Sequence, residues 1–199
     1  FVPESCMVSH MARPKEFDVD RALDSALDVF WSKGFEATSM QDLVDGMGIN
    51  RGSLYDTFGS KDELYRRAFA AYAQRRGAEL VDVLDGPGSV RERLRDYLLG
   101  LVTEPDGRGC FIVNTACERS YEHAESRAMA SAAMDATVGA LEGAMKSAAA
   151  GGELRPGVSP KVAASAVLVL MEGLQVVTKT GADATTLGPV VDAALDAIL

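Results

Sequence analysis

The sequence predicts an all-α protein, with a small N-terminal helix-turn-helix domain and a larger helical domain behind it. Alanine and leucine are abundant, whereas runs of β-branched residues are few. Apolar residues recur at helical spacing in segments that glycine, proline and capping residues separate. The stretch TSMQDLVDGMGINRGSLYDTFGSK, residues 38–61, reads as two short helices joined by a glycine turn, with a third helix directly behind.

A first helix is expected over about residues 18–33. Gly34 ends it, and Phe35 then turns back toward the core. One face of this helix is apolar, as expected of a helix that supports a core, and consists of Ala22, Leu23, Ala26, Leu27 and Phe30.

The next helix is short, and Thr38 with Gln41 fits a capping box at its start. Gly48 follows its last apolar residue, where a helix C-terminus favours a residue that tolerates positive φ. Ile49 then fills the gap between the two short helices. The apolar stripe of this helix is Met40, Leu43, Val44 and Met47.

Asn50 is placed to cap the second short helix, over about residues 51–57. This helix is expected to bury Leu54 and Phe58 and to leave its polar side outside. A helix that is polar on its free side and follows a tight glycine turn is the element that enters the DNA major groove in helix-turn-helix proteins.

The remaining breaks divide the chain into longer helices. Ser60 with Glu63 fits a capping box at the start of a helix over about residues 61–85, and Ser89 with Glu92 fits another. Ser159, followed by proline, opens a later helix. The expected helices after residue 85 cover about residues 89–103, 110–119, 122–150, 160–177 and 188–199, with a loop over 104–108.

The segment ALDVFWSKGFEATSMQDLVDGMGINRGSLYDTFGSKDELYRRAF resembles the TetR family of bacterial transcriptional regulators. The likeness rests on residues 34–38, 48–49, 52–55, 58 and 60–64, and it covers about a quarter of the chain. It implies a DNA-binding domain over residues 11–60 and a ligand-binding and dimerisation domain over residues 61–199. It also implies a ligand-responsive regulator, a repressor that a small molecule releases from its operator.

The charge balance opposes this reading in one respect. The chain carries a net charge of −9, and residues 12–61 hold six basic residues against nine acidic ones. Because DNA affinity depends largely on Lys and Arg facing phosphates, a DNA-binding role requires the acids to lie on a far face. Arg13, Lys15, Arg51 and Lys61 are expected on the near face.

Double-stranded operator DNA is the expected partner of the second short helix. The alternative to a DNA contact for Tyr55 is a half-buried aromatic packing role, and for Thr38 it is helix capping alone. Asp56 is unfavourable on a face that meets DNA. We expect the DNA contacts to come from Thr38, Arg51, Gly52, Ser53, Tyr55, Thr57 and Lys61.

The helix over about residues 162–177 is apolar almost all round, which predicts burial on most sides. It is too short for a membrane span and carries Glu172 and Gln175, so we expect no membrane contact. We predict a symmetric homodimer with a four-helix interface, the alternative being packing within one subunit. The expected interface residues are Val169, Gly173, Val176, Val177, Val190, Val191, Ala194 and Leu195.

A small-molecule effector, largely apolar, is expected in the larger domain, although ordinary core packing is the alternative for each candidate. Glu172 stands out, because a buried carboxylate without a partner is costly. The candidate ligand-binding residues are Tyr97, Phe111, Asn114, Glu118, Tyr121, Met134, Val138, Met171, Glu172 and Gln175.

Cys110 is a possible redox site, because it lies near a predicted helix N-terminus and follows Arg108. A thiol-based electrophile or oxidant sensor is therefore an alternative function, and a small buried apolar residue is the bland alternative. Three cysteines are too few for a disulfide framework, which suits the cytoplasm.

The remaining classes are weaker. No phosphate-binding loop, nucleophile elbow or zinc-protease motif occurs, so we expect no enzyme, no metal and no cofactor. A helical adaptor that does not bind DNA, or a small enzyme, remains as the alternative of a different class. Residues 1–10 show no helical period and are interpreted as a tag remnant or a disordered arm.

Overall fold

The computed structural model describes residues 17–103 and 107–199, which form an all-helical fold as predicted. The expectations for residues 1–10, for Arg13 and Lys15, and for part of the 104–108 loop lie outside the described residues. The helices are α1 (Val19–Lys33), α2 (Met40–Met47), α3 (Arg51–Phe58), α4 (Lys61–Leu84), α5 (Val90–Thr103), α6 (Phe111–Arg119), α7 (Ala124–Gly151), α8 (Pro160–Thr178) and α9 (Ala184–Asp196).

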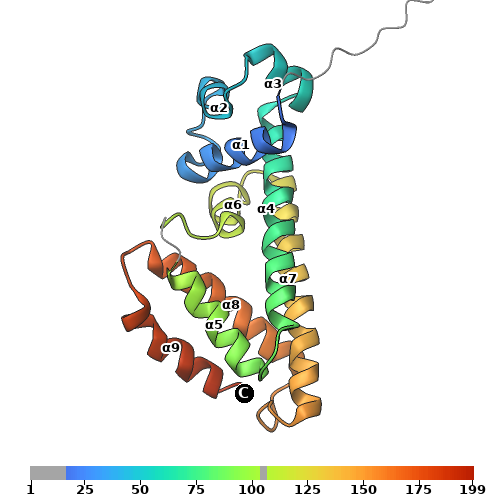
Figure 1. Cartoon of the computed structure of the whole chain (residues 1–199), viewed down its shortest axis with the longest axis vertical. Helices are drawn as coiled ribbons and strands as arrows, with labels where there is room; N and C mark the ends of the chain where they lie inside the picture. The colour runs from blue at the N-terminus through green and yellow to red at the C-terminus, as the bar shows by residue number, and fades with distance from the viewer. Residues whose placement is uncertain (1–16, 104–106) are drawn as a thin grey trace, which may run out of the picture.

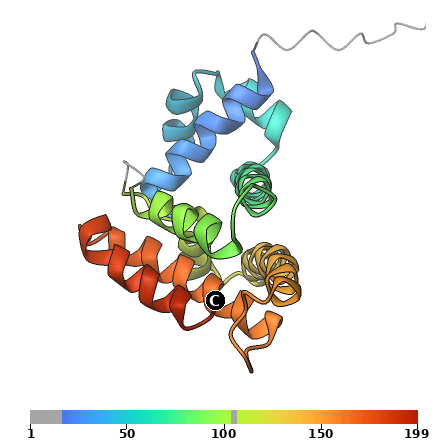
Figure 2. The same ribbon diagram turned by 60° about the horizontal axis from the view of Figure 1, so that its bottom comes forward.

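The molecule is elongated, and its two ends have different structures (Figure 1). Helices α1, α2 and α3 form one end and are called the N-terminal end below. The long helices α4 and α7 pack against each other and run down to the other end, where α5, α8 and α9 lie together. Helix α6 lies between the two ends, beside α4 and α7. Figure 2 shows α5, α8 and α9 from below, grouped on one side of α7.

Two hydrophobic cores correspond to the two ends. The first joins α1, α2 and α3 to the first half of α4 and to α6, and its largest buried side chains are aromatic. Phe111 of α6 lies within this core, with its ring centroid 5.3 Å from that of Tyr65 and 5.8 Å from that of Tyr72. The second core joins the end of α4 to α5, α7, α8 and α9. The first core therefore crosses the predicted domain boundary at residues 60–61.

Most predicted helix ends are confirmed by their capping hydrogen bonds. Asn50 Oδ1 accepts from the Ser53 N–H at 2.8 Å, and Gly48 takes a left-handed conformation with φ of 64°. The Ser89 N–H donates to Glu92 Oε2 at 3.0 Å, and the Glu92 N–H donates to Ser89 Oγ at 3.2 Å. This reciprocal pair is the predicted capping box.

The predicted capping box of Thr38 and Gln41 is wrong by one residue. Ser39 is the N-cap of α2, and its side chain and that of Asp42 bond each other's backbone N–H groups. The Thr38 hydroxyl instead donates to the carbonyl oxygen of Gly34 at 2.5 Å, which ties the α1–α2 turn together. Ser60 does cap α4 through the Glu63 N–H, but the Glu63 carboxylate pairs with Arg66 and Arg67.

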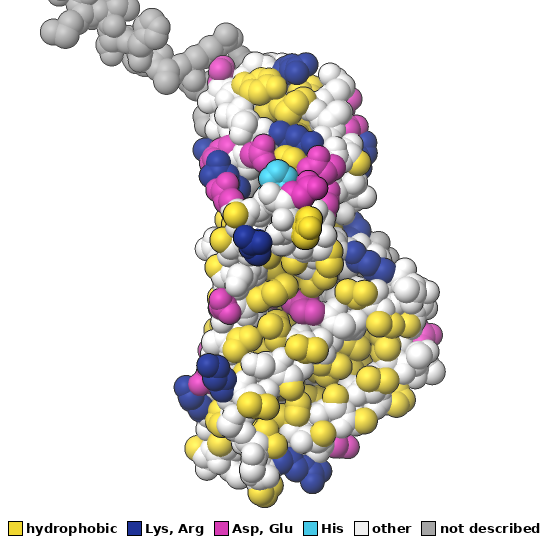
Figure 3. All heavy atoms as spheres, turned by 180° about the vertical axis from the view of Figure 1, so that it is seen from behind, with side chains coloured by type: hydrophobic (Ala, Val, Ile, Leu, Met, Phe, Trp, Pro, Cys, Tyr) yellow, Lys and Arg dark blue, Asp and Glu magenta, His cyan; other side chains and the backbone are white. Residues whose placement is uncertain are grey.

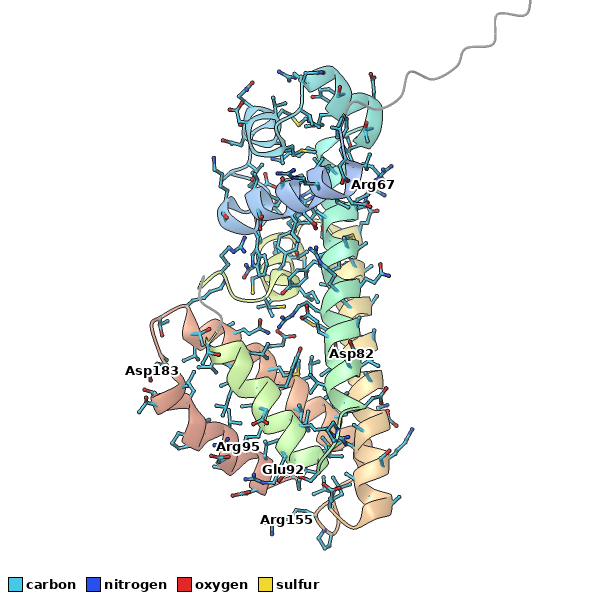
Figure 4. The ribbon with its side chains drawn as sticks, viewed as in Figure 1. Arg67, Asp82, Glu92, Arg95, Arg155 and Asp183 are labelled. Atoms are coloured by element: carbon cyan, nitrogen blue, oxygen red, sulfur yellow. The ribbon has the colours of Figure 1, made fainter. Side chains whose placement is uncertain are left out.

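The last helix begins earlier than predicted. Asp183 Oδ1 accepts from the Thr186 N–H at 3.0 Å and so starts α9 at Ala184, not near Gly188. Pro189 therefore lies inside the helix and not at its beginning. Helix α9 is held to α5 by ion pairs, one of which joins Arg95 to Asp192 at 2.6 Å; Figure 4 labels Arg95 on α5.

Candidate functional site

Helix α3 is a short helix with one buried and one free side. Leu54 and Phe58 are buried in the first core, and the Asn50 cap fixes the start of the helix. Arg51, Gly52 and Asp56 are exposed, and Tyr55 keeps 43% of its surface exposed. The exposed polar side of α3 therefore lies at the tip of the molecule, where an extended partner can approach it (Figure 1).

Two cationic groups adjoin this side of α3. The Arg51 guanidinium lies 5.8 Å from the centroid of the Tyr55 ring, so both side chains belong to one surface. The Lys61 ammonium lies 4.2 Å from the centroid of the Phe35 ring, and it therefore turns toward the α1–α2 turn. A phosphate contact by Lys61 requires the side chain to leave that ring.

Thr38 does not fit the DNA contact predicted for it, whereas the contact of Thr57 stays a prediction. Thr38 is 1% exposed and its hydroxyl is bonded to Gly34, so the predicted contact between the Thr38 hydroxyl and a phosphate is wrong. Thr57 is partly buried, and its carbonyl oxygen accepts from Arg67 at 3.4 Å. Figure 4 shows Arg67 near the start of α4, at the level of α1.

Three acidic residues of α1 and α2, namely Asp24, Asp28 and Asp42, are paired with basic side chains. Asp28 pairs with Arg108 at 2.9 Å, and Asp24 of α1 pairs with Arg75 of α4 at 2.5 Å. Asp42 pairs with Lys33, whose hydrogen bond lowers the pKa of the Asp42 carboxyl strongly. The charge segregation that DNA binding requires is thus partly present, although Asp56 remains exposed on α3.

A cavity of about 390 Å³ lies between α4, α5, α7 and α8, at the level of the N-terminus of α6. This volume falls within the range of about 300–1,000 Å³ that is usual for small-molecule sites. Four predicted ligand-binding residues line it, namely Tyr97, Met171, Glu172 and Gln175. Its walls are mainly apolar, because α7 contributes small residues such as Ala133, Ala136 and Ala140.

The other six predicted ligand-binding residues lie elsewhere. Phe111 belongs to the aromatic core, and Met134 and Val138 pack as partly buried members of the two cores. The Asn114 side chain bonds Lys179 and the Arg108 carbonyl oxygen. Glu118 is exposed and reaches the α1–α2 turn, and Tyr121 is 95% exposed beyond α6.

Much of the cavity wall comes from α4, which the sequence interpretation missed. Gln74, Arg76, Gly77 and Leu80 line it. The small residues on α7 leave the space that these side chains border.

Burial raises the pKa values of two ionisable groups at the cavity, Glu172 and Cys110. Burial raises the pKa of Glu172 to about 7, while a hydrogen bond with Cys110 and attraction to Arg76 lower it. Burial also raises the pKa of the Cys110 thiol to about 11, and the nearby Glu172 adds to the rise. Cys110 is 5% exposed at the N-terminus of α6, so the predicted activation of this thiol is wrong.

Helix α6 connects the cavity to the N-terminal end of the molecule. Cys110 and Ile112, at its start, line the cavity. Near its end, Glu118 Oε1 accepts from the Glu36 N–H of the α1–α2 turn at 3.0 Å. Arg119, which is buried, donates to Asp62 of α4 at 2.9 Å and lies 3.3 Å from the centroid of the Phe35 ring. Helix α6 therefore contacts both the cavity and the α1–α2 turn.

A third candidate surface is the free side of α8 and α9. The exposed valines of α8 and α9 are Val162, Val169, Val176, Val177 and Val190, and Val169 is 71% exposed. Figure 3 shows hydrophobic side chains gathered over the lower half of the molecule, below the mixed charges of the N-terminal end. Because α8 leaves this side free within one chain, packing inside one subunit does not bury it on most sides, and the predicted burial requires a partner surface.

Two predicted interface residues face inward instead. Val191 and Leu195 are fully buried in the second core, so their assignment to the interface is wrong, and Ala194 is only partly exposed. By length and composition alone, α8 is long and apolar enough to cross a membrane, so the expectation that it is too short for a span is wrong. Its packing against α5, α7 and α9 instead favours a surface that meets another protein chain.

Within residues 17–103 and 107–199, no group of three or more His, Cys, Asp or Glu side chains is placed to hold a metal ion. Cys117 is exposed and Cys110 is buried, and each carries a free thiol.

Two family descriptions match the chain. Residues 22–68 match bacterial regulatory proteins of the tetR family, and residues 90–194 match the tetracyclin repressor-like C-terminal domain. The first match contains α2 and α3 entirely, and the second contains the cavity walls that α5, α7 and α8 supply.

Similar proteins are HTH-type transcriptional regulators. The uncharacterized regulator YezE of Bacillus subtilis (strain 168) is 40% identical over 113 residues, which are 55% of this chain and 58% of that protein. The repressor ComR of Escherichia coli (strain K12) is 35% identical over 114 residues, which are 55% of this chain and 54% of that protein. The matched region thus spans less than two thirds of either relative.

A solved structure extends the likeness to the whole fold. The TetR family transcriptional regulator CifR, a cysteine mutant complexed with 26-base-pair double-strand operator DNA, is 34% identical with a TM-score of 0.83. The alignment covers 94% of this chain and 100% of that one.

Proposed function

The chain belongs to the TetR family of bacterial transcriptional regulators, and we propose that it is a homodimeric repressor that a small molecule releases from operator DNA. The members of this family are transcriptional regulators and not enzymes. One observation carries the proposal. Helix α3 follows a left-handed turn at Gly48, and the Asn50 side chain caps its N-terminus. Its polar side is free and lies at the tip of the molecule. This is the geometry in which a recognition helix enters the major groove.

Four side chains or backbone positions form the proposed DNA-reading surface. Arg51 and Ser53 read base edges or phosphates, Tyr55 donates its hydroxyl to a phosphate, and Gly52 admits the DNA backbone closely. The pairing of Asp24, Asp28 and Asp42 with basic side chains supports this assignment, because a neighbouring positive charge offsets each of these carboxylates. We assign Lys61 a phosphate contact that it makes once it leaves the Phe35 ring.

The proposed homodimer joins two copies through the free apolar side of α8 and α9. Its central residues are Val169, Gly173, Val176, Val177 and Val190. Two copies related by a two-fold axis then offer two α3 helices to DNA, about 34–36 Å apart or at a multiple of that spacing. Loss of this spacing weakens both half-site contacts together.

The proposed switch runs through α6. A ligand that fills the cavity contacts residues beside Cys110 and Ile112, and it favours the α6 position that accommodates it. Because Glu118 and Arg119 hold the α1–α2 turn and the start of α4, this position sets the orientation of the N-terminal end. The ligand shifts DNA affinity only to the extent that it binds the two α6 positions unequally.

The alternative of a thiol sensor at Cys110 is not favoured, because a buried thiol with a raised pKa is a poor nucleophile at neutral pH. The alternative of an adaptor that does not bind DNA leaves the exposed polar side of α3 without a role. The cytoplasm, where operator DNA is available, is the proposed location.

Selection from a random library of duplex DNA tests the function without a known operator. The full chain is expected to enrich one palindromic sequence and to bind it less tightly as salt rises, since phosphate contacts release counterions. Failure to enrich any sequence, with binding that depends on duplex length alone, would overturn the proposal.

A further inference from the structure

The cavity contains one carboxylate that the protein leaves incompletely satisfied. Glu172 lies on α8 between Met171 and Gln175 along the cavity wall. Its Oε2 atom is buried and has no hydrogen-bond partner among the residues that the structure describes. An unpartnered buried oxygen costs more than a solvated one, because water no longer donates to it.

The groups that face Glu172 come from three neighbouring elements. Arg76 of α4 attracts it, although the Arg76 guanidinium also pairs with Glu79 of the same helix at 3.0 Å. Cys110, which precedes α6, hydrogen bonds with it, and Tyr97 of α5 lies in the same wall. Helix α7 adds alanines and Thr137 but no charged side chain.

We infer that the cavity takes an apolar small molecule carrying one protonated amine, whose ammonium group donates to Glu172. This inference rests on the proposed function, since it names the chemical class of the effector. The ammonium supplies the missing donor to Oε2, and a charge-assisted hydrogen bond is about twice as strong as a neutral one. The alanine-rich wall of α7 receives the apolar part of the ligand.

The electrostatics distinguish an amine from other apolar ligands. A carboxylic acid would bring a second negative charge against Glu172, while the Arg76 cation is already engaged by Glu79. An alcohol supplies a donor but adds no positive charge beside the buried carboxylate. An ammonium group does both, and it therefore favours the ionised form of Glu172.

A matched set of probes tests the inference: n-octylamine, n-octanol and octanoate share a chain length and differ in the head group. Calorimetric titration of the full chain at pH 8 is expected to show octylamine binding about 10- to 100-fold more tightly than octanol, with octanoate weakest. Near pH 7, octylamine binding is expected to release protons from Glu172.

The variant Glu172→Gln is expected to remove the preference for octylamine over octanol. Glu122→Gln, which removes an exposed carboxylate between α6 and α7, is the matched control and is expected to keep the preference. The wild-type comparison and its proton release need no variant, so the test stands even if Glu172→Gln folds poorly. Octanol or octanoate binding as tightly as octylamine, or no octylamine binding at all, would overturn the inference.

Operator binding is measured in parallel without any probe. If the wild-type chain selects an operator but shows no preference for octylamine, the amine inference fails and the proposed function stands. If the chain selects no DNA sequence, the proposed function fails whatever the cavity binds.

Discussion

Arg119 at the end of α6 donates a hydrogen bond to Asp62 at the start of α4, with 2.9 Å between Nη2 and Oδ1. The Arg119 side chain is buried, whereas the Asp62 side chain is exposed. Its guanidinium also stacks on Phe35, next to the α1–α2 turn. This arrangement joins α6, whose start lines the cavity, to the start of α4 and to the α1–α2 turn.

Replacement of Arg119 tests this joint. Arg119→Met is expected to lower the free energy of unfolding by about 2–4 kcal/mol, because it removes the stacking on Phe35 and the bonds to Asp62 and Ser126. Arg119→Lys is expected to recover only part of this, since an ammonium cannot stack and bond at once. Urea unfolding at a fixed protomer concentration measures both.

The exposed Arg127 on α7 provides the control for that series. Arg127→Met is expected to change the free energy of unfolding by less than about 0.5 kcal/mol, as surface substitutions usually do. Equal losses in the Arg119 and Arg127 variants would contradict the role given to Arg119.

The pKa of Glu172 predicts a dependence of stability on pH. In the unfolded chain this carboxyl loses its proton near the ordinary value of 4.5, whereas in the folded chain it keeps it up to about 7. The folded state binds more protons in this window, so the free energy of unfolding falls as pH rises through it. Glu172→Gln is expected to be more stable than the wild type by about 1–3 kcal/mol at pH 8 and similar near pH 4.

Thermal unfolding across that pH range measures the difference. The control Glu122→Gln is expected to follow the wild-type curve at every pH. A wild-type curve parallel to that of Glu172→Gln from pH 4 to 8 would show that Glu172 ionises normally.

The absence of a Cβ atom at Gly46 allows α2 to approach α1 closely. A Cβ atom at Gly46 would lie 2.4 Å from the Val29 Cγ2 atom. Gly46→Ala is therefore expected to destabilise the fold by about 1–3 kcal/mol through overpacking. The double variant with Val29→Ala should recover part of the loss.

Gly100 of α5 is the matched control, because a Cβ atom there meets nothing within 4 Å. Gly100→Ala is expected to stabilise the chain by about 0.5–1 kcal/mol, since alanine is the better helix former. The sign of the change, measured by thermal unfolding, thus separates crowding from helix propensity. Destabilisation of equal size at both positions would mean that crowding at Val29 is not the cause.

The free apolar side of α8 and α9 predicts how the oligomeric state responds to charge. Val169→Glu places a carboxylate at the most exposed valine of this side and is expected to convert the dimer to a monomer, because two like charges meet across the two-fold axis. Tyr121→Glu changes an even more exposed residue outside this side. It should leave the dimer intact in analytical ultracentrifugation, and a Val169→Glu dimer would refute the proposed interface.

Local signals in the sequence sufficed for most helix ends. The Asn50 cap, the Gly48 turn and the Ser89–Glu92 box each depend on residues within four positions of one another, and each is present as expected. Thr38 and Ser39 are adjacent and both able to cap, so the choice between them depended on the α1–α2 turn, where Gly34 takes the Thr38 hydroxyl.

Packing between distant helices was harder to predict. Phe111 had the same apolar character as a ligand-binding residue, but the aromatic rings of α1 and α4 take it into the core. Val191 and Val190 are neighbours, and only the angle at which α9 meets α5 decides which one is buried. The cavity depends on small residues of α7 facing α4, a relationship that no local pattern encodes.

The central claim, that the free side of α3 reads operator DNA, is tested most directly by the affinity of Arg51→Ala for the selected duplex. With the Arg127→Ala variant as control, Arg51→Ala is expected to bind about 10- to 100-fold more weakly, while the control binds like the wild type. A combined Arg51→Ala and Tyr55→Ala variant that is folded, dimeric and still binds the selected duplex with wild-type affinity would contradict it.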